Sequence, residues 1–334
     1  MIFPAFTAGF LRPKTEIYYN ISMKHIVIAG PTASGKTALS LALARALGCE
    51  IISADSRQVY TDLTIGTAKP QGHWHDKNYL VENIPYHLVD FLPPDKTFDV
   101  FSFCEKSHAL LNNRPDKPFI FAGGTGMYLH ALFIGIDKLP PANDALRTEL
   151  AAFAEQNGRA ALHARLNEID PLSAAQIPPQ NIHRVIRALE ICQLTGRPAS
   201  QVKSGAFFQT QFPDDKVLFV YLNWDKELLN QRIAARTQAM LDPMVQETRA
   251  LLARGFTPDC AGLKSLGYPE ILQWINGLRT REETLEKIIT RTRQYAKRQR
   301  TWFNRYKNIL RLDFVRPQDF ELNALVRRIT SSLE

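Results

Sequence analysis

Residues 30–37 read GPTASGKT, which is the complete pattern of a phosphate-binding loop. An apolar run of strand length, His25–Ala29, precedes the loop, and a helix-forming stretch, Ala38–Leu47, follows it and ends at Gly48. Strand, glycine loop and helix are the context that this motif needs, because N–H groups at the start of the helix bind phosphate oxygens. The loop therefore predicts an α/β fold and a diphosphate or triphosphate ligand. It leaves open which group carries the phosphates.

Two residues of this loop have specific expected roles. Lys36 supplies a positive charge, and the Thr37 hydroxyl is the usual ligand of a Mg²⁺ ion that accompanies the phosphates. We expect the phosphates to contact the whole loop, which consists of Gly30, Pro31, Thr32, Ala33, Ser34, Gly35, Lys36 and Thr37.

Further strand-like runs indicate a P-loop doubly wound parallel sheet. Residues 50–54 end at Asp55, residues 118–122 end in the glycine-rich run 123–126, and residues 216–222 are continuously apolar. Ligands gather at the carboxyl ends of strands in such sheets, so Asp55 should face the phosphate loop. Asp55 could instead be a helix N-cap, but the neighbouring motifs favour a carboxylate that accepts a proton or holds Mg²⁺ through water.

The pattern changes along the chain. Residues 23–139 and 206–315 are expected to form the P-loop core, and residues 140–205, which are amphipathic without a strand-like run, an inserted all-helical domain. Residues 61–94 are polar and turn-rich, and residues 224–334 read as largely helical, with 316–334 as a helical tail. Residues 1–22 precede Met23 and are interpreted as a disordered N-terminal extension, or as a stretch included because the start site was assigned too far upstream.

Composition is ordinary for a globular protein, with 45% apolar and 22% charged residues among 334. No run approaches the eighteen or so apolar residues of a membrane span. Four isolated cysteines fit a reducing cytoplasm, and a monomer is the default expectation. The chain carries 41 Lys and Arg against 33 Asp and Glu, a net charge of +8 that would help to attract a nucleic acid.

Two groups of basic residues follow the last apolar run. Arg232 and Arg236 lie one helical turn apart; we expect Arg236 to hold a departing phosphate group and Arg232 to lie on a solvated helix face. Between residues 290 and 303, basic residues recur at helical spacing among aromatic ones. That stripe fits either a solvated face or an RNA contact, and the residues alone leave both open.

Seven stretches resemble the tRNA dimethylallyltransferase (tRNA isopentenyltransferase) family. They are GPTASGKT at 30–37, SADSRQVY at 53–60, IGTAKP at 65–70, AGGTGMY at 122–128, HRVIRALE at 183–190, SLGYPE at 265–270 and TRQYAKRQRTWF at 292–303. The likeness runs from Lys24 to about Asp313, and IGTAKP and the last stretch are its most specific parts. The chain departs from the family at 242–244, where Asp-Pro-Met replaces a glycine-containing turn, and at Lys264 and Pro269, where many relatives carry arginine.

The resemblance implies transfer of a dimethylallyl group from dimethylallyl diphosphate to N6 of adenosine 37, 3′ of the anticodon, in tRNAs reading UNN codons. Asp55 would be the general base, while Lys36, Thr125 and Arg236, helped by Mg²⁺, would stabilise the leaving diphosphate. The helical insertion would hold the anticodon stem-loop, and the flipped base would enter a channel opposite the donor. The implied tRNA contacts are Asp55, Ser56, Arg57, Gln58, Thr125, Arg147, His183, Arg184, Arg187, Lys264, Ser265, Leu266, Gly267, Tyr268, Arg293 and Lys297.

Two other classes of function stay open at this point. A small-molecule kinase would share the phosphate loop and the paired arginines, and it would consume ATP without RNA. An RNA-binding module without catalytic activity would bind anticodon stem-loops and transfer nothing.

Overall fold

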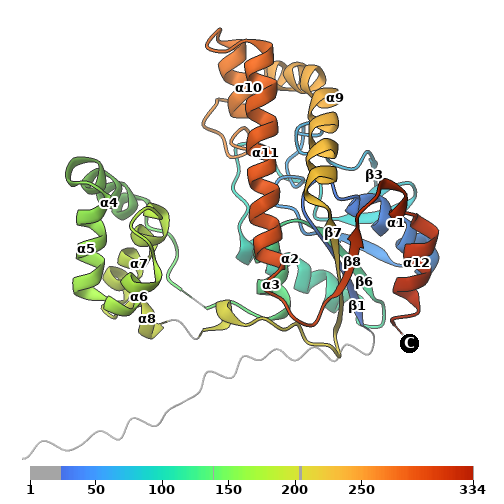
Figure 1. Cartoon of the computed structure of the whole chain (residues 1–334), viewed down its shortest axis with the longest axis horizontal. Helices are drawn as coiled ribbons and strands as arrows, with labels where there is room; N and C mark the ends of the chain where they lie inside the picture. Colours follow the sequence, from blue (N-terminus) through green and yellow to red (C-terminus); the bar gives the residue numbers. More distant parts are fainter. Residues whose placement is uncertain (1–23, 138, 203–204, 334) are drawn as a thin grey trace, which may run out of the picture.

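The computed structural model describes residues 24–137, 139–202 and 205–333, so the expectation for residues 1–22 lies outside them. Eight strands of the described chain form one sheet in the order β3-β4-β5-β2-β6-β1-β7-β8. Its central strands are β1 (His25–Ala29), β2 (Glu50–Ser53), β6 (Phe119–Gly123) and β7 (Val217–Trp224), and all of their pairings are parallel. This arrangement is the predicted doubly wound parallel sheet (Figure 1).

Four strands lie where no strand was expected. In the turn-rich segment 61–94, β3 (His73–His75), β4 (Asn78–Val81) and β5 (Ile84–His87) extend one side of the sheet, and β4 is antiparallel to both β3 and β5. At the other edge, β8 (Leu310–Phe314) pairs with β7 within the segment expected to be helical. These strands are three to five residues long; β3 is exposed, and the other three are only partly buried. They therefore lack the continuous apolar run that identified the central strands.

Helices cover both faces of the sheet because the central strands are buried on both sides. Along β1, Ile26 and Ile28 pack with α1 (Lys36–Leu47) and α12 (Leu322–Thr330), whereas Val27 and Ala29 face α2 (Val100–Asn113) and α3 (Gly126–Phe133). The segment expected to be a tail thus packs onto the core, because α12 lies against α1. The alternation explains why these strands read as unbroken apolar runs.

Three further helices stand on the carboxyl side of the sheet (Figure 1). They are α9 (Lys226–Ala253), α10 (Tyr268–Ile275) and α11 (Arg281–Phe303), and they share a buried cluster with the segment 59–63. Helix α9 continues through Pro243, so the unusual Asp-Pro-Met sequence does not end the helix near Arg236. No helix in the described ranges is long and apolar enough to cross a membrane.

Residues 144–202 form a separate group of helices. These are α4 (Asp144–Asn157), α5 (Arg159–Ile169), α6 (Pro171–Gln176), α7 (Ile182–Thr195) and α8 (Ala199–Val202). They pack on one another around their own apolar cluster, which includes Leu150, Leu166 and Leu189. In Figure 1 this group lies to one side of the sheet, and it contains no strand.

Candidate active site

The phosphate loop lies between β1 and α1, where the motif requires it. Gly35 has a φ of +94°, and a Cβ there would come within 2.5 Å of the Phe320 ring, so only glycine fits. The Lys36 ammonium group donates hydrogen bonds to the carbonyl oxygens of Gly30 (3.1 Å) and Pro31 (2.8 Å). Burial lowers the pKa of Lys36 to about 8; Asp55 opposes this shift, and Arg236 adds to it. The loop thus presents a cation that titrates near neutral pH.

Side chains from later in the chain hold three consecutive loop residues. Gln299 accepts from the Thr32 N–H (2.8 Å), and Arg236 donates to the Thr32 hydroxyl. Arg232 donates to the Ala33 carbonyl (2.9 Å), and the Trp224 indole donates to the Ser34 carbonyl (2.9 Å). Arg232 lies on an exposed helix face, as expected, and its guanidinium also lies 4.3 Å from the Trp224 ring centroid.

Two cavities meet beside this loop. The first, of about 540 Å³, is lined by residues 32–38 of the loop and α1, together with Arg232 and Arg236. The second, of about 450 Å³, is lined by residues 55–57, 264–266, α9 and α11. Six residues line both cavities: Thr32, Asp55, Thr67, Ala68, Arg236 and Tyr295. A ligand bound to the phosphate loop in the first cavity would therefore face a molecule in the second across Asp55.

Asp55 caps a tight turn, since no helix begins there, and it also lines both cavities. Its Oδ1 accepts hydrogen bonds from the N–H groups of Arg57 (2.8 Å) and Gln58 (3.3 Å), which is the N-cap geometry of a tight turn. The same side chain lies in the wall between the two cavities. The turn therefore fixes the carboxylate where a proton acceptor would be needed.

The second glycine-rich run, 123–126, lies against the end of β2. A Cβ at Gly123 would come within 2.1 Å of the Ala54 carbonyl oxygen, which explains the glycine. Next to it, the Thr125 hydroxyl accepts a hydrogen bond from the Ser56 N–H (3.1 Å). Thr125 thus supports the turn that carries Asp55, and it does not line the cavity that contains the phosphate loop.

Glu247 of α9 holds the loop that begins at Thr64. Its carboxylate accepts hydrogen bonds from the N–H groups of Thr64 (2.6 Å), Ile65 (2.8 Å) and Gly66 (3.2 Å) and from the Tyr268 hydroxyl (2.5 Å). Burial and this carboxylate raise the pKa of Tyr268. No pattern in the sequence identifies Glu247, because its partners lie in segments far from it along the chain.

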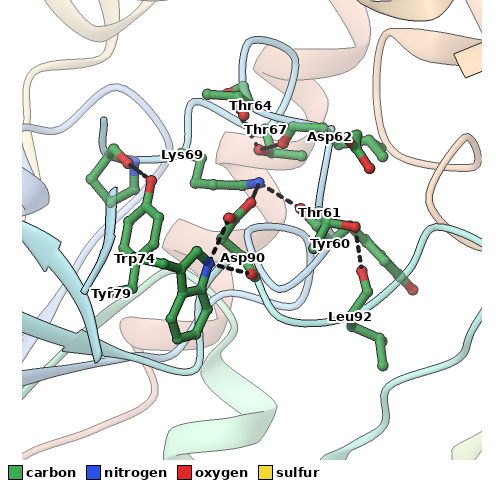
Figure 2. A network of polar contacts seen from close by, with 12 residues as sticks. Tyr60, Thr61, Asp62, Thr64, Thr67, Lys69, Trp74, Tyr79, Asp90 and Leu92 are labelled. Carbon is green, nitrogen blue, oxygen red and sulfur yellow. Dashed lines mark hydrogen bonds and ion pairs between the residues drawn. The ribbon is translucent and has the colours of Figure 1, made fainter. Parts of the chain in front are cut away.

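Lys69 holds the other end of the same loop (Figure 2). Its buried ammonium group donates to the Tyr60 carbonyl (2.5 Å) and forms an ion pair with Asp90. Asp90 in turn accepts from the Trp74 indole N–H (3.1 Å). Between these two anchors, Gly66, Thr67 and Ala68 line the second cavity. The IGTAKP stretch thus forms a wall of that cavity.

The structure separates the residues for which RNA contacts were expected. Lys264, Ser265 and Leu266 line the second cavity, and the Ser265 hydroxyl is buried without a hydrogen-bond partner in the described ranges. Tyr268 and Gly267 are buried beneath them, so the expected side-chain contact of Tyr268 with RNA is not possible in this conformation.

The same separation appears in the helical insertion. His183 and Arg184 are exposed on α7, but Arg147 and Arg187 both donate to the fully buried Glu190. Burial alone would raise the pKa of Glu190, but hydrogen bonds from Arg147, from the Asn143 N–H and from Arg187 lower it overall. These two arginines therefore stabilise the insertion, whatever else they contact.

On α11, the predicted residues Arg293 and Lys297 are exposed and do not line either of the two cavities. The helix presents other residues to the second cavity, namely Ile288, Arg291, Thr292, Gln294, Tyr295 and Arg298. The helical period explains the difference, since residues three or four apart share a face and a stripe chosen by charge alone can lie on a neighbouring face.

Two family models match the chain: IPP transferase over residues 58–306 and isopentenyl transferase over residues 23–78. A tRNA dimethylallyltransferase of Elusimicrobium minutum is 51% identical over 290 residues, covering 86% of this chain and 94% of that protein. One from Myxococcus xanthus is 44% identical over 283 residues, covering 84% and 89%.

Solved structures that are similar to this chain have related names. The tRNA isopentenylpyrophosphate transferase of Bacillus halodurans is 33% identical with a TM-score of 0.63, covering 93% of this chain and 96% of that one. A eukaryotic dimethylallyltransferase acting on tRNA is 29% identical with a TM-score of 0.70, covering 93% and 79%. None of these matches favours the small-molecule kinase alternative. With the phosphate loop and the two adjoining cavities in place, they show that this chain belongs to the IPP transferase family, the prenyl-transferring tRNA dimethylallyltransferases.

Proposed function

We propose that the protein transfers the dimethylallyl group of dimethylallyl diphosphate to N6 of adenosine 37 in tRNAs reading UNN codons. The products are N6-isopentenyladenosine and diphosphate. The family resemblance supports this reaction, and the relatives' names specify tRNA and the dimethylallyl group. We further propose that the protein acts as a monomer in the cytoplasm.

The observation that carries the proposal is the position of Asp55 in a wall common to both cavities. The donor diphosphate would occupy the cavity of the phosphate loop, and a flipped adenine would enter the cavity lined by 264–266 and α11. The residues that line both cavities include Asp55, Thr32 and Arg236. The reacting carbon and nitrogen would meet beside them.

In the reaction, N6 of adenine forms a bond to C1 of the donor while the bond from C1 to the diphosphate oxygen breaks. The amine becomes acidic only as it attacks, and Asp55 then accepts its proton. Lys36 and Arg236 line the donor cavity and would stabilise the negative charge that grows on the departing diphosphate. The proton ends on the carboxylate, and the electron pair of the broken bond stays with the diphosphate.

The residues present fit a Mg²⁺ ion that is held mainly by the diphosphate. Thr37 lines the donor cavity beside Lys36, and its hydroxyl would be the direct protein ligand. Within the described residues, no group of three or more His, Cys, Asp or Glu side chains could hold a metal ion by itself. The ion would neutralise diphosphate charge.

The test is incubation of the protein with dimethylallyl diphosphate, Mg²⁺ and an unmodified tRNA transcript that reads a UNN codon. Nucleoside analysis should show N6-isopentenyladenosine at position 37 and none in a transcript with guanosine there. Absence of product with every UNN-reading tRNA would overturn the proposal. ATP consumption without RNA would indicate a kinase, and stem-loop binding without transfer would indicate an RNA-binding module.

A further inference from the structure

Gln299 of α11 connects the two glycine-rich loops of the donor site. Its Oε1 accepts a hydrogen bond from the Thr32 N–H (2.8 Å), and its Nε2 donates to the Gly124 carbonyl (3.0 Å). The side chain is only 5% exposed and lines the donor cavity. It thus spans the gap between the phosphate loop after β1 and the loop after β6.

The chemistry at the two ends requires an amide. One end meets an N–H donor and the other a carbonyl acceptor, so a single orientation of the glutamine satisfies both. A carboxylate would set an oxygen against the Gly124 carbonyl and add negative charge beside the phosphate loop. An apolar side chain of the same length would leave the buried Gly124 carbonyl and the partly buried Thr32 N–H without this partner, which is costly.

Gly124 permits this close approach. A Cβ at position 124 would come within 2.1 Å of the Gln299 Nε2 atom, and its next neighbour outside that side chain would be the Gly30 carbonyl oxygen at 3.5 Å. Among the described residues, Gln299 thus makes the closest approach to this position. The glycine and the glutamine form a matched pair.

Thr32 is held at a second point by Arg236 of α9, which donates to its hydroxyl. Thr32 therefore has partners on both α9 and α11, and it lies where the two cavities meet. Both polar ends of the Gln299 amide already have backbone partners. This side chain is suited to hold the loop in place, and it has no role in proton transfer.

We propose that Gln299 is a positioning residue for the diphosphate donor: by holding Thr32 and Gly124 at a fixed separation, it sets the shape of the phosphate loop that the donor meets. This inference rests on the proposed function, because it takes the ligand of the loop to be the diphosphate of that reaction. The RNA-facing residues of α11 are not part of this contact, so the effect on donor binding should be separable from RNA affinity.

The experiment measures binding of inorganic diphosphate with Mg²⁺ in the absence of RNA, followed by steady-state kinetics. We expect Gln299→Met to raise the dissociation constant of diphosphate and the KM for dimethylallyl diphosphate about tenfold, as expected for the loss of hydrogen bonds to buried groups. The KM for tRNA should change less than about twofold. Gln299→Glu should raise the dissociation constant of diphosphate and the KM for dimethylallyl diphosphate more than Gln299→Met does. Gln238→Met, at an exposed position of α9, is the matched control and should behave like the parent protein.

A double-mutant cycle separates this role from general destabilisation. Gly124→Ala alone should weaken diphosphate binding, but in the Gln299→Ala background the same change should add almost nothing, because the space is then free. Unchanged diphosphate affinity in Gln299→Met, or additive effects in the cycle, would overturn the inference. Diphosphate binding is measured without RNA, so a failure of the prenyl-transfer proposal would appear separately, as a lack of product with the parent protein.

Discussion

At the scale of single residues, a few charged groups surround the point where the two cavities meet. Asp55 and Arg236 line both cavities, and Lys36 lines the one that contains the phosphate loop. The carboxylate is the group proposed to accept a proton from the acceptor amine, and the two cations are proposed to contact the donor. The structure therefore suggests separate tests for the base and for the lysine.

Replacing Asp55 by Asn should lower kcat by about 100- to 10,000-fold, the range that a positioned general base contributes. The Asn side-chain oxygen can still accept from the N–H groups of Arg57 and Gln58, so the turn should persist. Affinity for tRNA, measured by filter binding, should stay within about twofold. The control is Asp99→Asn, which replaces the N-cap of α2 that accepts from the Ser102 N–H. A fully active Asp55→Asn enzyme would show that another group accepts the proton.

The pKa of Lys36, lowered to about 8 by burial, predicts a pH dependence of donor binding. Below that pH the ammonium form predominates and attracts the diphosphate; above it the amine is neutral, so affinity should fall as pH rises through about 8. Lys36→Arg keeps its charge because the guanidinium stays protonated, and its affinity should not fall in that range. Titration calorimetry with dimethylallyl diphosphate from about pH 6.5 to about pH 9.5 measures this. The assignment fails if the parent protein shows a flat profile or if both proteins lose affinity together.

At the scale of elements, the loop 64–69 is held at both ends by charged side chains from elsewhere in the fold. Glu247 binds the N–H groups at its start, and Lys69 pairs with Asp90 at its end. Residues between these anchors line both cavities. Loss of either anchor should therefore affect both stability and the acceptor site.

Glu247→Gln should lower the free energy of unfolding by about 2 kcal/mol, because hydrogen bonds to a charged group are lost and an amide NH₂ cannot accept from the backbone. It should also raise the KM for tRNA, since Gly66 and its neighbours line the second cavity. Urea denaturation and steady-state kinetics measure the two effects. Glu286→Gln, on the exposed face of α11, should change neither. Equal behaviour of the two variants would contradict the anchoring role.

Lys69→Met should cost about 3 kcal/mol of stability, because it leaves Asp90 without its cation and the Tyr60 carbonyl without a donor. Adding Asp90→Asn should recover part of that loss, since the uncompensated charge is then gone. The exposed Lys77→Met is the control, and chemical denaturation gives the comparison. A double variant less stable than Lys69→Met would rule out the uncompensated charge as the main cost.

At the scale of the whole molecule, the core and the helical insertion each have an apolar cluster of their own. The long helix α11 runs from the sheet to the distal end of the helices α9 and α10 (Figure 1). One part of α11 lines the cavities, while Arg293 and Lys297 are exposed. This arrangement would let one helix contact both the flipped base and the RNA backbone.

The double variant Arg293→Glu and Lys297→Glu should weaken tRNA binding and reduce the slope of log K against log salt by about 2, one for each lost phosphate contact. The KM for dimethylallyl diphosphate should be unchanged, because neither residue lines the donor cavity. Arg327→Glu with Arg328→Glu makes the same charge change on the exposed face of α12 and should leave the slope as it is. If both double variants reduce the slope equally, only net charge matters, and the solvated-face interpretation of α11 holds.

Local sequence patterns were sufficient to predict the phosphate loop, the central parallel strands and the glycine-rich run at 123–126. Each of these depends on residues that are neighbours in sequence, so backbone geometry and burial leave a direct mark on the residue types. The short strands β3 to β5 and β8 have no such recognisable sequence pattern, because their pairing depends on the edges of a sheet that already exists. The sequence also identified Asp55, Lys36 and Arg236 correctly as residues that the fold brings together.

By itself, then, the sequence determined the fold class and the phosphate loop, because these depend on short-range spacing, and its resemblance to known sequences indicated the family. Only the tertiary structure decided that Gln299 holds Thr32 across 267 positions, that Glu247 occupies the N–H groups after Leu63, and that Tyr268 is buried. The physical reason is that a hydrogen bond or a buried contact is set by distance in space. Distant segments come within that distance only after the sheet and its covering helices have packed.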